Sequence, residues 1–128
     1  MRIRLLAALA ILSLPMTVGG CEKHLAAPTD PQVCWSMAVT KDGKVRFNKV
    51  AEHIPDLEHC AAQLEALRIK FLSMGGNQTE LTGAYQGSFL FLQREGVFTA
   101  QSYEATRYPF MERTGDGRLA VRGAMPPQ

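Results

Sequence analysis

The sequence predicts an α+β domain, in which a small antiparallel sheet packs with one main helix, preceded by an N-terminal signal helix. Short runs of alternating apolar residues are separated by glycine-containing turns, a pattern that is typical of strands joined by hairpins. One segment in the middle of the chain carries apolar residues at helical spacing. The predicted order of elements is therefore β-β-α-β-β-β-β, which is typical of an α+β domain.

The first predicted element is a removable export signal over residues 1–20. Arg2 and Arg4 form a short positive start, and an apolar run from Leu5 to Leu14 follows. This run spans about 10 residues, whereas a transmembrane helix needs ~20. A positive start, a short apolar run and small residues behind it are typical of a secretory signal. The alternative is an N-terminal anchor that is not cleaved.

The four residues Val18-Gly19-Gly20-Cys21 stand directly behind this region. They resemble the lipobox of bacterial prolipoproteins, which consists of an aliphatic residue, two small residues and a cysteine. The resemblance implies cleavage before Cys21 and a thioether-linked diacylglycerol on its sulfur, usually with an acyl chain on the new amine. It covers only these four positions, and Val18 stands where leucine is commoner. The alternative is ordinary cleavage that leaves Cys21 free.

A lipid on Cys21 predicts a membrane as the first partner of the mature protein. Two or three acyl chains anchor a protein stably, because each buried CH₂ contributes about 0.8 kcal/mol. Glu22 follows the cysteine, where an Asp in well-studied Gram-negative lipoproteins favours the inner membrane. By this analogy we expect the outer membrane, with the protein facing the periplasm. Residues 21–32 include two prolines and predict a flexible tether to the domain.

The cysteine count supports the lipid site. The chain has three cysteines, Cys21, Cys34 and Cys60, and an odd number in an exported protein needs an explanation. Lipid on the first cysteine leaves one pair, so we expect a disulfide between Cys34 and Cys60 in an oxidising compartment. The alternatives are two unpaired buried thiols and a metal site, which the absence of CxxC spacing disfavours.

A single domain is predicted over residues 33–124, and its first elements form a hairpin. Residues 33–39 alternate, with Trp35 and Met37 on one face and small residues on the other, which predicts a strand. Asp42-Gly43 is a typical hairpin turn, and residues 45–50 form the returning strand.

The main helix is expected to begin at Pro55, because a proline at the first helical position loses no hydrogen bond. Gly75 and Gly76 end it. Its apolar residues form one stripe, which consists of Leu57, Cys60, Ala61, Leu64, Leu67 and Phe71. A helix face that contains Cys60 can dock on the small-residue face of the first strand, where Cys34 lies.

The remaining strands are predicted over residues 81–93, 97–103, 108–112 and 118–121. The first is the longest, and its consecutive apolar residues indicate that both faces are covered. Gly83 and Gly87 within it suggest a bulge or a bend. Turns at 94–96 and 114–117 join the later strands, and residues 125–128 form a frayed tail.

The charge of the chain does not indicate a nucleic-acid partner. The formal net charge of the 128 residues is +2, and Arg2 and Arg4 account for all of it. Residues 21–128 therefore carry 12 basic and 12 acidic side chains, with no basic patch, although the isoelectric point of the whole chain is about 8.5. An apolar content of 46% indicates a globular protein.

Potential ligand and catalytic residues gather only around the start of the helix, where His53, His59 and Cys60 accompany Glu52 and Glu58. The two histidines are six residues apart, which is not the spacing of the HExxH metal motif. We therefore expect surface or capping roles, and neither a metal, a cofactor nor a catalytic set is predicted.

Aromatic residues concentrate in the C-terminal strands, and most of them must be core. Four are candidates for an interaction surface: Tyr85, Phe89, Tyr103 and Tyr108. The sequence thus predicts a membrane-anchored envelope lipoprotein that acts as a non-catalytic accessory, assembly or interaction subunit for another envelope protein. The alternative is a periplasmic module that binds a small ligand or a glycan on an aromatic sheet face.

Overall fold

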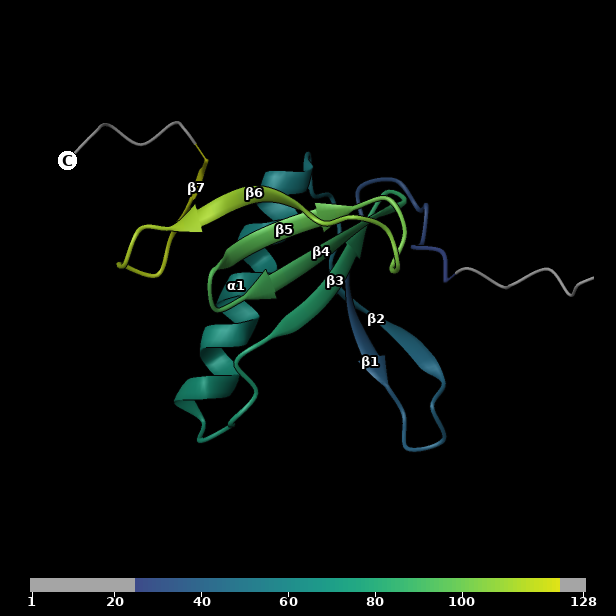
Figure 1. Cartoon of the computed structure of the whole chain (residues 1–128), viewed down its shortest axis with the longest axis horizontal. Coiled ribbons are helices and arrows are strands. Elements are labelled where there is room, and N and C mark those ends of the chain that lie inside the picture. The colour runs from purple at the N-terminus through teal and green to yellow at the C-terminus, as the bar shows by residue number, and fades with distance from the viewer. Residues whose placement is uncertain (1–24, 123–128) are drawn as a thin grey trace, which may run out of the picture.

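The structure is a computed structural model that describes residues 25–122 (Figure 1). The predicted signal, Cys21 and the tail over 125–128 lie outside these residues. The described chain forms one helix and seven strands: β1 (Cys34–Val39), β2 (Val45–Ala51), α1 (Leu57–Ser73), β3 (Leu81–Tyr85), β4 (Ser88–Gln93), β5 (Gly96–Ala100), β6 (Tyr108–Arg113) and β7 (Leu119–Val121). The strands form one antiparallel sheet in the order β2-β1-β3-β4-β5-β6-β7. A small antiparallel sheet with one helix is therefore confirmed.

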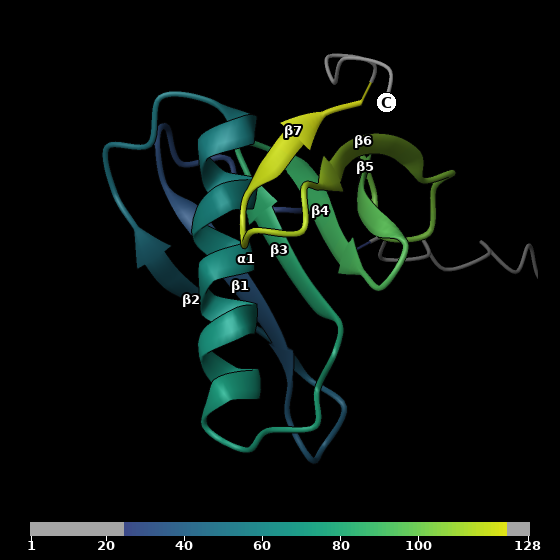
Figure 2. The ribbon, with the colours of Figure 1, turned by 90° about the vertical axis from the view of Figure 1, so that its left-hand side faces the viewer.

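The helix covers one face of the sheet, as Figures 1 and 2 show from two directions. On this helix face a core forms around Cys60 and Leu64 of α1 and Leu90 and Leu92 of β4. The opposite face, called here the aromatic face, carries a second core of Trp35, Met37, Phe47, Ala84, Phe89, Phe91, Phe98, Ala100 and Tyr103. Phe89 to Leu92 alternate between the two cores, so the expectation that both faces are covered is confirmed.

The helix begins at Leu57, two residues later than expected. Asp56 is the N-cap, and its carboxylate accepts a hydrogen bond from the His59 amide at 2.8 Å. An aspartate in this position satisfies one of the amides that the first helical turn leaves unpaired. Pro55 therefore precedes the helix rather than opening it.

The predicted strand over 81–93 is in fact the hairpin of β3 and β4. Gln86 and Gly87 have φ angles of 43° and 86°, and Tyr85 pairs with Ser88. A two-residue turn with two positive φ angles matches the twist of the strands that it joins. The Gln86 side chain also accepts a hydrogen bond from the Gln32 amide at 2.8 Å, which holds the turn. The sheet therefore has one strand more than the predicted order.

The other hairpins agree with the sequence. Gly43 has a φ of 81° in the turn between β1 and β2, and residues 114–118 join β6 to β7. One strand is shorter than expected, because β5 ends at Ala100 and Tyr103 lies in the loop that follows.

The disulfide between Cys34 and Cys60 is present and joins β1 to α1. Both cysteines are fully buried. The bond thus holds the helix against the small-residue face of β1, which answers a question that the sequence pattern left open. The helix stripe is buried only in its first half, because α1 continues past the start of β3 (Figure 1), and Phe71 is 42% exposed.

The prediction of a flexible tether over 21–32 needs correction for residues 25–32, because this segment packs on the domain. Leu25 and Ala27 pack on the aromatic face, and Ala27 is only 6% exposed. The Pro28 carbonyl accepts a hydrogen bond from the Gly87 amide, and the Gln32 carbonyl accepts one from the Ile54 amide. The segment thus belongs to the folded domain from Leu25 onward.

Candidate functional site

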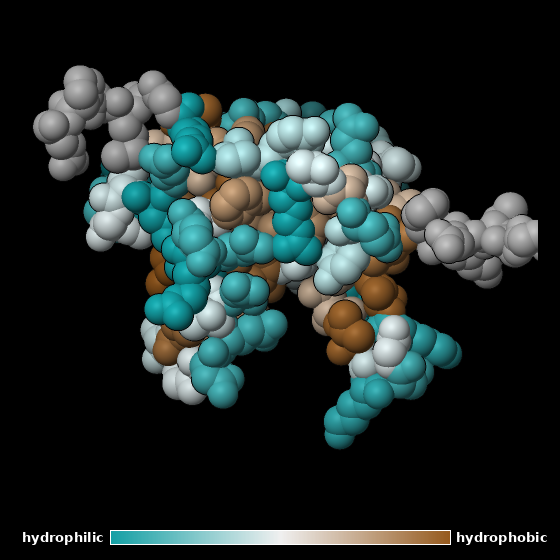
Figure 3. Space-filling model, in the orientation of Figure 1, coloured by the Kyte–Doolittle hydropathy of each residue, from teal (hydrophilic) through white to brown (hydrophobic). Residues whose placement is uncertain are grey.

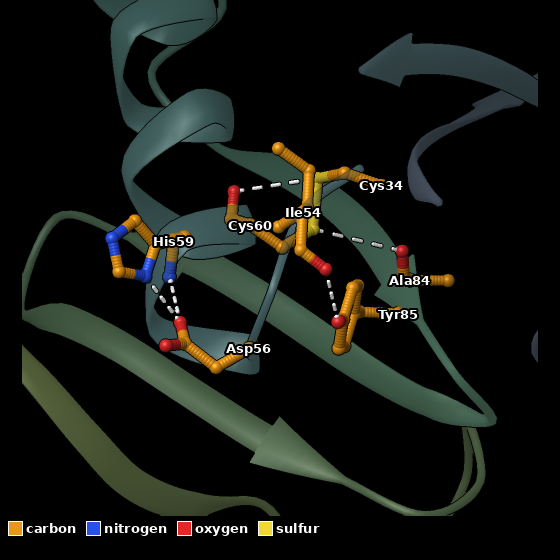
Figure 4. Close-up of a disulfide and its surroundings, with 7 residues drawn as sticks. All are labelled: Cys34, Ile54, Asp56, His59, Cys60, Ala84 and Tyr85. Carbon is orange, nitrogen blue, oxygen red and sulfur yellow. Dashed lines mark hydrogen bonds and ion pairs between the residues drawn. A yellow bond between two sulfur atoms is a disulfide. The ribbon is translucent and has the colours of Figure 1, made fainter. Parts of the chain in front are cut away.

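The four aromatic residues expected to form a surface do not lie together. Tyr85 is 4% exposed, and its hydroxyl donates a hydrogen bond to the Ile54 carbonyl at 2.5 Å beside the disulfide (Figure 4). Phe89 is fully buried on the opposite side of the sheet. Both are core residues, so the expectation of a surface that contains them needs correction.

The other two aromatic candidates are accessible but line different hollows. Tyr103 is half-buried on the aromatic face, where its ring centre lies 5.9 Å from those of Phe89 and Phe91. The guanidinium of Arg107 stands 3.7 Å from the centre of the Phe91 ring, in a cation–π contact. Tyr108 begins β6 and is 63% exposed. Tyr103 is therefore the only candidate that helps to form an accessible aromatic patch.

In the histidine cluster at the start of α1, His59 contacts the N-cap residue of its own helix. His59 Nδ1 lies 2.6 Å from the Asp56 carboxylate (Figure 4). Hydrogen bonds from the backbone amide and the ring of His59 hold the pKa of Asp56 below its usual range. Cys60 is used in the disulfide. Within residues 25–122 no three His, Cys, Asp or Glu side chains are grouped to hold a metal ion.

One buried charge cluster was not expected from the sequence. Glu65 is 2% exposed, and its carboxylate accepts hydrogen bonds from Arg68 at 2.8 Å and from Arg113 at 2.7 Å. Burial opposes ionisation of Glu65, but the two guanidinium groups outweigh it and lower the pKa of the carboxyl. Arg113 also donates to the carbonyls of Gln93 and Arg94, so the cluster ties α1 to the strands β4 and β6.

A groove separates the hairpin of β1 and β2 from the C-terminal half of α1, and we call it the hairpin–helix groove. Figure 3 shows it as a hollow between two projecting parts of the molecule, with hydrophobic surface on both. Its volume is about 590 Å³. The groove is lined by Ser36, Met37, Ala38, Val39, Asn48, Phe71, Gln78, Glu80, Leu81, Thr82 and Tyr103.

Two apolar side chains that line the groove are unusually accessible. Val39 is 62% exposed at the end of β1, and Phe71 is 42% exposed on α1. The pairing of β1 with β3 ends at Met37 and Thr82, so β1 continues past β3 at this point. The sequence signal was the apolar stripe of the helix, which runs longer than the sheet that it covers.

A second cavity of about 580 Å³ lies near the start of α1. Its lining is more hydroxylic and consists of Leu57, Ser88, Thr99, Ala100, Gln101, Ala105, Thr106 and Tyr108. Hydroxyl and amide groups beside an exposed tyrosine ring can bind a small polar ligand.

Among residues 25–122, no helix is both long and apolar enough to cross a membrane. The chain matches no protein-family model, and neither the curated proteins nor the solved structures contain a significant match to it.

Proposed function

We propose that the protein is a lipid-anchored envelope lipoprotein that acts as a non-catalytic interaction subunit, and that it binds an extended apolar segment of another envelope protein in the hairpin–helix groove. The observation that carries the proposal is the groove itself, because Val39 and Phe71 both line it and both remain exposed. Large exposed apolar side chains that gather around a hollow are typical of a docking site.

The chemistry of the groove matches that of a protein interface. Its lining includes the apolar side chains of Met37, Val39, Phe71 and Leu81. Polar side chains, which include Ser36, Asn48, Gln78 and Glu80, line it as well. Protein interfaces commonly combine an apolar centre with a polar rim that keeps hydrogen bonds to water.

An extended segment is the occupant that the strands favour. Ala38 and Val39 continue β1 beyond its pairing with β3, which begins only at Leu81. A strand edge of this kind can accept backbone hydrogen bonds from a bound peptide, while the groove receives its alternate side chains.

The envelope location follows from the N-terminal sequence and agrees with the cysteine chemistry. The motif that ends in Cys21 is the proposed lipid site. A buried disulfide is typical of proteins that fold in an oxidising compartment, and the Cys34–Cys60 bond supports an exported domain.

Site-specific photocrosslinking in cells tests the groove. Gln78 lines it and is exposed, so a photoreactive benzoylphenylalanine at this position contacts any occupant. Gln101, an exposed residue in the cavity at the start of α1, provides the matched control. We expect a single recurrent adduct with an envelope protein from position 78, none from position 101, and loss of the adduct when Phe71→Asp is added.

The outcomes of this experiment are decisive. Absence of an adduct at position 78 contradicts the proposed docking site, and so does an adduct that persists with Phe71→Asp. Circular dichroism of each variant controls for folding, and Phe71 is suited to substitution because it lies outside both buried cores.

A second function, binding of a glycan, is favoured by the cavity near Tyr108. Aromatic rings stack on sugar rings, and the hydroxyls of Ser88, Thr99 and Thr106 offer hydrogen bonds beside Tyr108. In this case the photoreactive group at position 101 gains the mass of a cell-wall fragment, and position 78 gives no adduct.

A further inference from the structure

We propose that the aromatic face of the β1–β2 hairpin rests on the anionic surface of the membrane that holds the lipid anchor. This inference builds on the proposed function, because it requires lipid on Cys21. It adds an orientation: the sheet turns its aromatic face to the lipid headgroups and its helix face to the aqueous side.

The path of the chain limits how far the domain can stand from the membrane. Leu25 packs on the aromatic face, where the core includes Trp35 and Phe89. Only four peptide units join Leu25 to Cys21, and an extended chain spans at most ~3.5 Å per residue, or about 14 Å in all. The aromatic face therefore lies within about 14 Å of the anchored cysteine at the point where the chain leaves the domain.

The helix lies on the other side of the sheet. In Figure 1 the segment that begins at Leu25 is at the right of the sheet, and α1 is at the left. A short anchor that leaves from the aromatic face brings that face, rather than α1, towards the lipid.

The hairpin presents a continuous apolar surface on this side. Its register places Trp35 beside Lys49, Met37 beside Phe47, and Val39 beside Val45. Paired residues of an antiparallel sheet share a face, so five of these six side chains form an apolar stripe that ends in the exposed Val39. Trp35, Met37, Phe47 and Val45 are each partly exposed, so the stripe is not closed by the rest of the described domain.

The charge of the hairpin suits an anionic lipid surface. Residues 40–50 contain four cations, Lys41, Lys44, Arg46 and Lys49, and a single carboxylate on Asp42. Lys44 is 82% exposed, and although Lys49 pairs with Glu52 it remains 49% exposed. Basic side chains near an anionic membrane surface are attracted to it, and the attraction falls off within a Debye length.

The helix layer has no such surplus of cations. Helix α1 carries two carboxylates, Glu58 and Glu65, and two cations, Arg68 and Lys70, and the buried Glu65 is paired with Arg68 and Arg113. The surplus of cations on the hairpin and the exit of the chain from the aromatic face thus favour the same orientation.

The single tryptophan of the chain makes the orientation measurable. In a Trp35→Phe background, Val39→Trp places the only indole at an exposed position of the aromatic stripe, and Tyr108→Trp provides the matched exposed position outside it. The full-length lipoprotein carrying each pair of substitutions is reconstituted into vesicles of phosphatidylethanolamine and phosphatidylglycerol. The vesicles contain a phospholipid brominated near the headgroup, which quenches nearby indoles.

We expect strong quenching and a blue-shifted emission at position 39, and little of either at position 108. Lys44→Glu should reduce the quenching at position 39, because the contribution of one basic residue at an anionic surface corresponds to about a fivefold change in binding. Replacing phosphatidylglycerol with phosphatidylcholine should reduce it as well. Equal quenching at both positions, or quenching at 108 alone, overturns the orientation, as does absence of quenching at 39.

The mass of the same samples separates this inference from the proposed function. If the intact mass includes a lipid and the indole at position 39 is not quenched, the lipid anchor is supported but the proposed orientation is wrong. If no lipid is present, the proposed anchor fails and the orientation fails with it. Circular dichroism verifies that the Trp35→Phe background keeps its fold, and wild-type Trp35 provides an unsubstituted reference signal.

Discussion

At the scale of single residues, the ionised Glu65 is the most consequential feature that the structure adds. A carboxylate that is 2% exposed is stabilised by the two guanidinium groups that hold it, from Arg68 and Arg113. Removal of one partner from a buried ion cluster is strongly destabilising, because it leaves the remaining charges without compensation.

We predict that Glu65→Gln lowers the free energy of unfolding by about 3 kcal/mol at pH 7. The pKa of Glu65 is lowered in the folded protein from its ordinary value of 4.5. The stabilisation is therefore complete above pH 4.5 and is lost as the pH falls through the lower pKa of the folded state. Urea denaturation of both proteins from pH 7 to pH 3 should show the difference between them shrinking with acidification.

The matched control is Glu112→Gln. Glu112 pairs with Arg122 at 3.4 Å, and its side chain is 44% exposed. Exposed ion pairs contribute about 0–1 kcal/mol, so this substitution should have little effect. An equal loss of stability in the two variants, or a Glu65→Gln effect that does not change with pH, would contradict the role assigned to the buried carboxylate.

The sequence predicted the Cys34–Cys60 disulfide but could not predict the ion pair between Glu65 and Arg113. The predicted lipid on Cys21 leaves Cys34 and Cys60 as the remaining pair, so counting sufficed to predict the disulfide. Glu65 lies beside the apolar stripe of the helix and three residues before Arg68, which is a local signal. Its second partner, Arg113, is 48 residues away and becomes a neighbour only through the order of the strands.

At the scale of elements, the contact between α1 and β3 depends on Gly83. A Cβ atom at this position would overlap the side chain of Leu64 and lie 2.6 Å from the Trp35 carbonyl oxygen. Leu64 is fully buried, so it has no space into which it can move. The glycine thus allows the helix to approach the sheet closely.

We predict that Gly83→Ala destabilises the domain by about 1–3 kcal/mol, which is the usual cost of overpacking a core. Thr82→Ala, at the neighbouring and half-buried position of the same strand, provides the control and should cost less. Thermal unfolding followed by circular dichroism compares the two. A Gly83→Ala protein as stable as the wild type would mean that α1 does not press on this strand.

The residues in the turns explain which elements could be predicted from the sequence and which could not. The turns at Asp42-Gly43 and at 114–117 carry familiar turn residues, and both were identified. Gln86-Gly87 does not, because glutamine rarely adopts a positive φ, so the hairpin of β3 and β4 was predicted as one long strand. Gly83 suggested a bend, whereas its actual role is to accommodate Leu64.

At the scale of the whole molecule, we predict that the protein extracted from membranes begins at Cys21 and carries a lipid on it. Intact mass spectrometry should find a polypeptide of residues 21–128 with additional mass, all of it on the N-terminal peptide. No cysteine should react with an alkylating reagent before reduction, and two should react after it. Cys21→Ser should remove the additional mass.

A different first residue contradicts this prediction, and so does a third reactive cysteine after reduction. The fold is not expected to change in Cys21→Ser, because the disulfide joins the other two cysteines. Circular dichroism of this variant is therefore the control.

The whole-molecule arrangement was the least accessible to sequence reasoning. Residues 25–32, which are rich in alanine and proline, have the composition of a linker. Their contacts with Gly87 and Ile54 depend on backbone hydrogen bonds, which composition does not reveal. The groove was missed for a related reason: the length of a helix is visible in a sequence, but the point at which its sheet ends is not.

The bond between Cys34 and Cys60 also has a consequence for the proposed export of the chain. The reducing cytosol keeps such thiols reduced, so in the proposed route the chain acquires the bond only after export. Closing a loop between residues 26 apart contributes about 3.5 kcal/mol in the chain-entropy model. In the proposed route the reduced precursor is therefore the less stable form, and the domain becomes harder to unfold once the bond has formed.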